Sequence, residues 1–550
     1  MAAETSATTL GGPEQALRDG DFERARSGFE AALAETDTAE AHDGLGRALW
    51  WLGDESGALD HRERAYVALR ARGEAARAAR IALWLSREYL ESVGNEPASN
   101  GWAARATGLL RDALPGPEHG WLELTLADRA LDPSEIRGRG EAALEIARRH
   151  DEVDLEASAL AVVGRAAVLD GDLESGMTAL DEAMTAATAG EVMDPLVFGD
   201  ICCVVTRACE EAGELGRLMR WNEVVMSFLE RHHHAPLIRW CGTCGAEVFL
   251  ATGDIATAEQ CLVETIGGLE ATGHRSRCIQ PNVKLAELRL LQGRVEEAER
   301  LLAGTDDLPE STRPLAALHL AKGEASVAAA ILLRELNRIG DTVAAIPLLS
   351  LLIEVQVAQG SLDEAGATLH RLSAIVERSA HPRYVGLREL AAGRIARARG
   401  DGAARELLSS AVTTLTQVEA RLEAARARFE LAATVVDEAP EFAIREARAA
   451  VDAFETIGAT READAAAALV RDLGGPARTG PKLIGKLSKR ELDVLHLLGE
   501  GLSNAEIAAR LYISTKTAGN HVSNVLAKLG VRNRAEAAAL AVRGGLQPVE

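Results

Sequence analysis

A glycine followed by a polar and then an apolar residue recurs along most of the chain, and this repeat limits the possible folds. The glycines at 171, 213, 253 and 293 are separated by 42, 40 and 40 residues. Glycine ends helices because it adopts positive φ without strain, and an amphipathic run after the turn begins the next helix. Such spacing is typical of stacked helical hairpins. Instances are Gly20-Asp21-Phe22, Gly171-Asp172-Leu173, Gly213-Glu214-Leu215, Gly253-Asp254-Ile255, Gly293-Arg294-Val295, Gly360-Ser361-Leu362 and Gly400-Asp401.

The composition agrees with a fully helical chain. Hydrophobic residues make up 47% of the 550 residues, but aromatic residues only 3%, whereas strands favour aromatic and β-branched side chains. We therefore expect an all-α protein in which a helical-hairpin solenoid occupies residues 1–473. The chain has no basic start followed by an apolar run and no apolar stretch of about twenty residues. A cytoplasmic protein without a membrane partner is expected.

A second domain is predicted after a linker rich in helix breakers. Gly474-Gly475-Pro476 and Gly480-Pro481 mark a flexible linker over 474–484, and residues 485–550 follow as a separate domain. Residues 482–550 contain ten Lys and Arg against six Asp and Glu, a net charge of +4, while the remainder carries −27. Phosphate binding requires a positive surface, so only this end is suited to nucleic acid. We hypothesise that the acidic remainder docks on the basic domain or repels DNA from it.

The C-terminal domain is predicted to contain four short helices. Three pairs combine a side-chain acceptor at a helix start with a carboxylate three residues later, which satisfies free backbone donors. These pairs are Ser488 with Glu491, Ser503 with Glu506, and Asn533 with Glu536. Gly499 and Gly501 are expected to end the first helix.

The third helix of this domain is expected to bind DNA. Ser514 can cap it, and one face carries the apolar residues that would pack inward: Ala518, Val522, Val525, Leu526 and Leu529. Its other positions are short, polar or cationic, which suits a major groove and its phosphates. We expect Asn520 and Ser523 to contact base edges. The remaining predicted DNA contacts, to phosphates or nearby bases, are Thr515, Lys516, Thr517, Gly519, His521, Asn524 and Lys528. An ordinary solvated helix face is the alternative, but the helix-turn-helix spacing favours the groove.

The segments LSKRELDVL, EGLSNAEIA, NHVSNVLAKLGV and RAEAAALA stand in this order within the last seventy residues. There the chain resembles the LuxR-type (GerE-like) helix-turn-helix family of bacterial transcription regulators. The resemblance implies DNA recognition through the third helix, an inverted-repeat operator in double-stranded DNA, and RNA polymerase as a partner. It also implies a homodimer that pairs through the fourth helix, at Ala537, Ala538, Leu540, Ala541 and Val542. Gly519 departs from the family, since a long polar residue often stands there, and glycine costs a helix about 1 kcal/mol relative to alanine.

Residues 1–473 resemble the tetratricopeptide-like region of larger LuxR-type regulators. The resulting hypothesis is a sequence-specific DNA-binding transcription regulator, controlled by an unknown protein or small-molecule effector that binds the helical repeats. The alternative is an interaction scaffold whose C-terminal module serves dimerisation. We expect no enzyme and no cofactor, because the one near-match to a phosphate loop, Gly480 to Lys486, lacks the following Ser or Thr and a preceding strand.

Two further groups of residues have competing interpretations. Cys241 and Cys244 form a C-x-x-C motif just after His232, His233 and His234; helix packing is favoured over zinc binding or redox switching. All seven tryptophans precede residue 241 and are expected to anchor neighbouring helices. The rival interpretation is a ligand pocket, since the adjacent Trp50 and Trp51 cannot share one helix face. In that case one of them faces the concave side of the solenoid.

Overall fold

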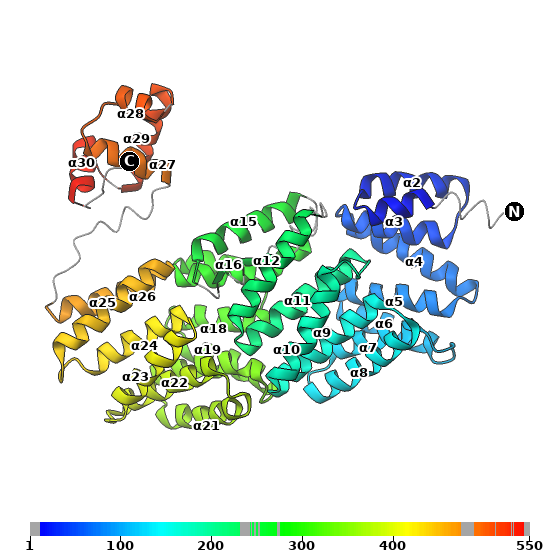
Figure 1. Ribbon diagram of the computed structural model, residues 1–550, viewed down its shortest axis with the longest axis horizontal. Coiled ribbons are helices and arrows are strands. Elements are labelled where there is room, and N and C mark those ends of the chain that lie inside the picture. The colour runs from blue at the N-terminus through cyan, green and yellow to red at the C-terminus, as the bar shows by residue number, and fades with distance from the viewer. Residues whose placement is uncertain are drawn as a thin grey trace. The chain divides into compact units, whose positions relative to one another are not determined.

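The structure, a computed structural model, describes residues 11–231, 243, 245–246, 249–250, 253–271, 275–474, 489–511, 513–529, 531 and 533–543. All regular secondary structure in these ranges is helical (Figure 1). The chain divides into unit 1, Met1–Leu469, and unit 2, Val470–Glu550. The predicted all-α fold is confirmed.

Unit 1 is built from consecutive antiparallel helices. Its N-terminal half contains α2 (Phe22–Glu35), α3 (Ala39–Trp51), α4 (Glu55–Ala71), α5 (Ala75–Glu91), α6 (Glu96–Leu110), α7 (Pro117–Arg129), α8 (Pro133–His150), α9 (Val153–Asp170), α10 (Leu173–Thr188), α11 (Pro195–Ala212) and α12 (Leu215–Arg231). There follow α15 (Ile255–Ala271), η1 (Arg275–Cys278), α16 (Ile279–Leu291), α17 (Val295–Leu302), η2 (Pro309–Ser311), α18 (Thr312–Ala321), α19 (Ala325–Ile339), η3 (Val343–Ala345), α20 (Ile346–Gln359), α21 (Leu362–Ser379), α22 (Pro382–Arg399), α23 (Ala404–Gln417), α24 (Arg421–Thr434), α25 (Pro440–Ile457) and α26 (Thr460–Asp472).

The repeated glycine turns end one helix and start the next. At Gly171 the backbone is left-handed, with φ +97°, and Asp172 accepts a hydrogen bond from the Ser175 N–H at 3.3 Å to cap α10. Six of the predicted turns lead directly into α2, α10, α12, α15, α17 and α21, each beginning at the apolar third residue of the turn. These turns are confirmed. Equivalent turns that were not predicted from the repeat lie at Gly53, Gly73 and Gly323, also at positive φ and each followed by Asp or Glu.

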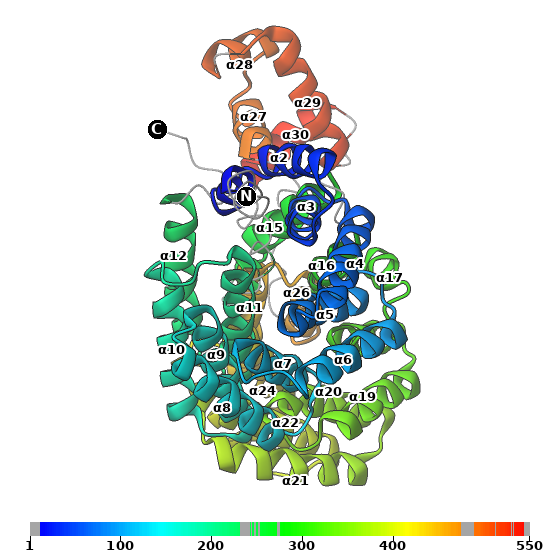
Figure 2. The ribbon, with the colours of Figure 1, turned by 90° about the vertical axis from the view of Figure 1, so that its right-hand side faces the viewer.

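Alternate helices of unit 1 form an inner layer in two runs. Helices α5, α7, α9 and α11 contact one another in sequence, and so do α16, α18, α20, α22 and α24. Seen from its N-terminal end, unit 1 arranges the helices from α4 to α12 along an arc (Figure 2). Close packing depends on small residues: a Cβ on Gly176 of α10 would lie 2.8 Å from the Gly164 carbonyl oxygen of α9. The low aromatic content is therefore compatible with a dense core.

Segments far apart in sequence meet within unit 1. The Tyr384 hydroxyl at the start of α22 donates to the Glu211 carbonyl near the end of α11, and burial raises the pKa of Tyr384 well above its ordinary value. Ala344 packs against a small cluster that includes Ala166 and Leu169 of α9. These contacts join α9 and α11 to η3 and α22, which follow much later in the chain, and limit how far unit 1 can flex.

Trp50 and Trp51 both anchor α3 to neighbouring helices. Trp50 is 3% exposed and donates its indole N–H to Glu88, while Trp51 stacks on Phe22 with ring centroids 5.0 Å apart.

Cys241, Cys244 and His232 to His234 lie outside the described residues, as does the segment Gly480 to Lys486. Within the described ranges, no three His, Cys, Asp or Glu side chains are grouped to hold a metal ion. None of the helices described there has the length and hydropathy needed to span a bilayer.

Candidate nucleic-acid interface

Unit 2 folds around its own apolar core. Its helices are α27 (Lys489–Gly499), α28 (Asn504–Arg510), α29 (Thr515–Leu529) and α30 (Arg534–Arg543). The buried cluster comprises Val494, Leu495, Leu497, Leu498, Ile507, Ala508, Ala518, Val522, Val525, Ala537 and Ala541. The predicted inward position of Ala518, Val522 and Val525 on α29 is confirmed, whereas the Leu529 side chain lies outside the described part.

Two of the three predicted caps lie within the described residues. Before α28, Ser503 Oγ accepts from the Glu506 N–H at 3.4 Å, and Glu506 accepts from the Ser503 N–H at 2.7 Å. Hydrogen bonds from the Ser503 side chain and backbone N–H to the Glu506 carboxylate hold the pKa of Glu506 below its ordinary value. At α30, the Asn533 side chain accepts from the Glu536 N–H at 3.0 Å. Ser488, the third predicted cap, lies outside the described residues.

The N-terminus of α29 is held by its predicted cap. Ser514 Oγ accepts from the Thr517 N–H at 3.1 Å and lies 2.7 Å from the Thr517 hydroxyl. This cap satisfies one of the free N–H groups in the first turn. Among the described side chains, the first three residues of α29 are exposed: Thr515, Lys516 and Thr517. A capped helix start with a cation beside it is well suited to a phosphate group.

The exposed face of α29 continues through Ser523 and Asn524, whereas Gly519 and His521 are half-buried. Ser523 donates its hydroxyl proton to the Gly519 carbonyl at 3.0 Å. The Ser523 oxygen therefore keeps only acceptor capacity toward a ligand. The side chains of Asn520 and Lys528 lie outside the described part, and only their backbone positions on α29 are placed.

Two arginines of unit 2 form hydrogen bonds within the domain. Arg490 of α27 donates to the Leu511 carbonyl at 2.5 Å. Arg534 of α30 donates to the Asn504 side chain at 3.3 Å and to the Leu502 carbonyl. Arg510, by contrast, is exposed in the last turn of α28, next to the turn into α29. Arg510 was not among the predicted DNA contacts, although its basic side chain just before the turn was a usable signal.

Not all of the predicted dimer contacts on α30 are exposed. Ala537 and Ala541 are 0% and 3% exposed because they pack into the core of unit 2. Ala538 is half-buried, and the side chains of Leu540 and Val542 lie outside the described part. Two of the five predicted positions therefore support the domain itself.

Comparison with known families agrees with the division of the chain into unit 1 and unit 2. Residues 485–541 match the bacterial regulatory proteins of the luxR family (GerE), and residues 125–348 match the MalT-like TPR region. Residues 485–541 are thus a LuxR-type helix-turn-helix domain, and residues 125–348 within the repeats are of the MalT-like tetratricopeptide kind.

Curated relatives match the C-terminal part of the chain. The transcriptional regulatory protein LnrK of Bacillus subtilis (strain 168) is 50% identical over 66 residues, 12% of this chain and 30% of that protein. The DNA-binding transcriptional activator DevR/DosR of Mycobacterium tuberculosis is 44% identical over 92 residues, 16% of this chain and 42% of that protein. The chain thus spans less than half the length of either relative.

Among solved structures, the chain is similar to a chain of the APC/C hetero-tetramer Cut9-Hcn1, with a TM-score of 0.41 and 12% identity over 84% of this chain and 96% of that one. It is also similar to the yeast Tom70 structure, with a TM-score of 0.27 and 13% identity over 86% of this chain and 97% of that one.

Proposed function

We propose that this chain, which joins a MalT-like tetratricopeptide region to a LuxR-type helix-turn-helix domain, is a transcription regulator whose DNA binding is controlled through its helical repeats. The single observation that carries the proposal is the division of α29 into two faces. Ala518, Val522 and Val525 are buried, while Lys516 and Ser523 are exposed. A helix held on one side by a core can present its other side to the major groove.

We assign the predicted contacts on α29 by their chemistry. Thr515, Lys516 and Thr517 at the capped helix start bind phosphate oxygens, and Asn520 binds a base edge. Ser523, whose proton is donated to the helix backbone, accepts from a base donor such as an adenine or cytosine amino group. The other proposed DNA contacts are Gly519, His521, Asn524 and Lys528, and we add Arg510 as a phosphate contact.

The domain limits are proposed as 1–473 for the sensory region, 474–484 for the linker and 485–550 for the DNA-binding domain. We propose a homodimer on an inverted-repeat operator, with RNA polymerase as a further partner and an effector bound by the helical repeats. Because Ala537 and Ala541 are committed to the core of unit 2, the dimer contact along α30 uses Ala538, Leu540 and Val542.

The experiment that tests the proposal is a footprint of the purified full-length protein on bacterial DNA, followed by titrations of the protected fragment. Lys516→Gln should weaken binding to every sequence and lower the salt dependence by about one phosphate contact, whereas Asn520→Ala should alter the sequence preference. Lys322→Gln is the matched control, since Lys322 is exposed in the turn between α18 and α19 and its one ion pair among the described residues is with Glu299.

Three outcomes are distinguishable. Protection of two half-sites with the predicted effects of Lys516→Gln and Asn520→Ala supports the proposal. Protection that neither substitution changes would reject the assigned orientation of α29. A stable dimer that protects no DNA would support the alternative, an interaction scaffold whose C-terminal module serves only dimerisation.

A further inference from the structure

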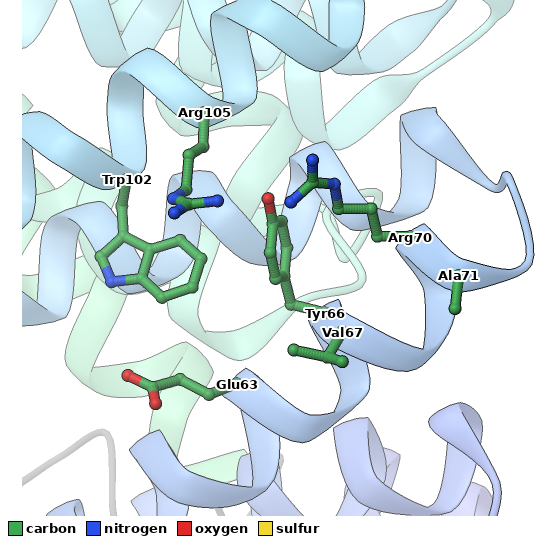
Figure 3. A pocket seen from close by; sticks show the side chains of 7 residues that line it. All are labelled: Glu63, Tyr66, Val67, Arg70, Ala71, Trp102 and Arg105. Carbon is green, nitrogen blue, oxygen red and sulfur yellow. The ribbon is translucent and has the colours of Figure 1, made fainter.

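A groove lies between α4 and α6, two neighbouring helices outside the inner layer of unit 1. Helix α4 contributes Tyr66, Val67 and Arg70 to its lining, and α6 contributes Trp102 and Arg105 (Figure 3). The groove is open to solvent and has a volume of about 480 Å³, which falls within the range of small-molecule sites in proteins. The spacing of residues 66, 67 and 70 places them on one face of α4, directed at α6.

The hydroxyl of Tyr66 opens into this groove without a partner. The Tyr66 side chain is only 3% exposed, yet its hydroxyl forms no hydrogen bond with any residue that the structure describes. The hydroxyl faces the open groove, where it can donate a hydrogen bond to an acceptor that enters.

Two arginines flank that hydroxyl. Arg70 and Arg105 come from different helices, and their guanidinium groups lie on opposite sides of the Tyr66 hydroxyl in Figure 3. Both are exposed, and neither forms an ion pair within the described ranges. By contrast, Arg72 and Arg77 close by both bind Glu40. Two cations that line one groove and form no ion pair can both bind the same anion.

An aromatic wall adjoins the cationic end. The Trp102 ring meets the Tyr66 ring edge-on, with centroids 4.9 Å apart and an interplanar angle of 90°. Val67 beside it is 63% exposed. This combination offers apolar surface for a flat ring and stacking on the half-buried indole. Trp102, rather than Trp50 or Trp51, is thus the tryptophan that lines a ligand-sized groove.

Glu63 makes one end of the groove negative, opposite the positive end formed by the arginines. Its carboxylate accepts from the Tyr89 hydroxyl at 2.7 Å, and this bond raises the pKa of Tyr89 to about 12. In Figure 3 the Glu63 carboxylate lies on the Trp102 side of the groove, away from Arg70. An anionic group is therefore repelled from the Glu63 end and attracted to the arginine end.

We propose that the α4–α6 groove binds a small aromatic carboxylate. The carboxylate accepts from the Tyr66 hydroxyl and from Arg70 and Arg105, and the ring lies against Trp102 and Val67. Binding itself depends only on unit 1. That the bound carboxylate controls DNA binding is a separate step, which rests on the proposed function.

The test is isothermal titration of the full-length protein with 2-naphthoate, and with neutral 2-naphthalenemethanol as the uncharged analogue. We expect saturable binding of one naphthoate per chain and much weaker binding of the alcohol. Arg70→Gln and Arg105→Gln should each weaken naphthoate binding about tenfold, the usual loss for one charge-assisted hydrogen bond. Tyr66→Phe, which removes only the hydroxyl, should weaken it about fivefold.

Arg64→Gln is the matched control, because Arg64 is an exposed arginine of the same helix that pairs with Asp60. It should bind naphthoate as the native protein does, and circular dichroism should show that all variants remain folded. Equal binding of the alcohol, an equal loss in Arg64→Gln, or no saturable binding at millimolar naphthoate would overturn the proposal. Tighter binding of a polyglutamate peptide than of naphthoate would also overturn it, in favour of a protein partner. Because no DNA is present, failure here leaves the proposed DNA-binding function intact.

Discussion

Arg277 in η1 forms an ion pair with Glu88 in α5, with 2.9 Å between Nη2 and Oε1, although 189 residues separate them in the chain. The Glu88 carboxylate is almost fully buried and also accepts from the Trp50 indole at 2.9 Å and the Ser92 hydroxyl at 2.7 Å. The guanidinium of Arg277 lies 4.8 Å from the centroid of the Trp50 ring. This cluster ties the N-terminal helices of unit 1 to the segment that precedes α16.

Glu88→Gln should destabilise unit 1 by about 3 kcal/mol, because it removes the nearer carboxylate paired with the largely buried Arg277 and leaves the more distant Glu91, at 3.6 Å. The loss is measurable as a lower urea midpoint of the helical signal at pH 7. Glu145→Gln is the control, since Glu145 is 73% exposed and pairs with Arg149 on the same helix; it should change stability by less than about 0.5 kcal/mol. Equal midpoints for the two variants would contradict a stabilising role for the cluster.

The Glu88 cluster should also make the stability of unit 1 depend on pH. Burial alone would raise the pKa of Glu88, but Arg277 and Arg87 outweigh it and keep the pKa below its ordinary value. The contribution of Glu88 is therefore complete above the ordinary glutamate pKa and is lost as pH falls through the lower value of the folded state. We expect the native and Glu88→Gln midpoints to converge as the solution is acidified from pH 7 to 3. A constant difference would contradict the assigned charge.

The turns of unit 1 could be predicted from the sequence because each depends on adjacent residues. Gly171 supplies positive φ and Asp172 supplies the next cap, so three letters determine where α10 begins. The contact of Arg277 with Glu88 could not be predicted in this way. It depends on the curvature accumulated over many hairpins, which no local pattern encodes.

The burial and exposure of residues in the candidate DNA interface could be predicted where they follow the period of the helix. Buried Val522 and exposed Ser523 on α29 follow from a period of 3.6 residues and the cap at Ser514. The use of Arg534 inside the domain was not predictable, because its partners Asn504 and Leu502 lie about thirty residues away. The groove between α4 and α6 was also missed, since its two arginines come from different helices.

Leu498→Ala should destabilise unit 2 alone. Leu498 is 1% exposed in a buried cluster that contains only residues of unit 2, and truncation of such a leucine costs about 3 kcal/mol. Calorimetry of the full-length protein should show a lower melting temperature for the unit 2 transition and an unchanged one for unit 1. A parallel shift of both transitions would show that the two units unfold together.

Ser514→Ala should weaken the start of α29. The substitution removes the acceptor for the Thr517 N–H, and loss of such a cap costs about 1 kcal/mol. Ser514→Asp is the informative comparison, because it retains an acceptor and restores the stability of unit 2. Its negative charge should nevertheless weaken DNA binding at the proposed phosphate contact. If Ser514→Asp bound DNA as tightly as the native protein, phosphates would not approach this helix start.

Gly519→Ala should stabilise unit 2 by up to about 1 kcal/mol, since alanine favours a helix interior more than glycine does. The space permits it: a Cβ at Gly519 would lie 3.6 Å from Asn504 Nδ2, an ordinary van der Waals contact. Gly44→Ala is the matched control in unit 1, because a Cβ there would lie 2.3 Å from the Phe29 ring. That substitution should destabilise unit 1 by about 1 to 3 kcal/mol through overpacking. Calorimetry should therefore show opposite shifts of the two transitions, and a lower melting temperature for Gly519→Ala would mean that α29 needs glycine for closer contact with α28.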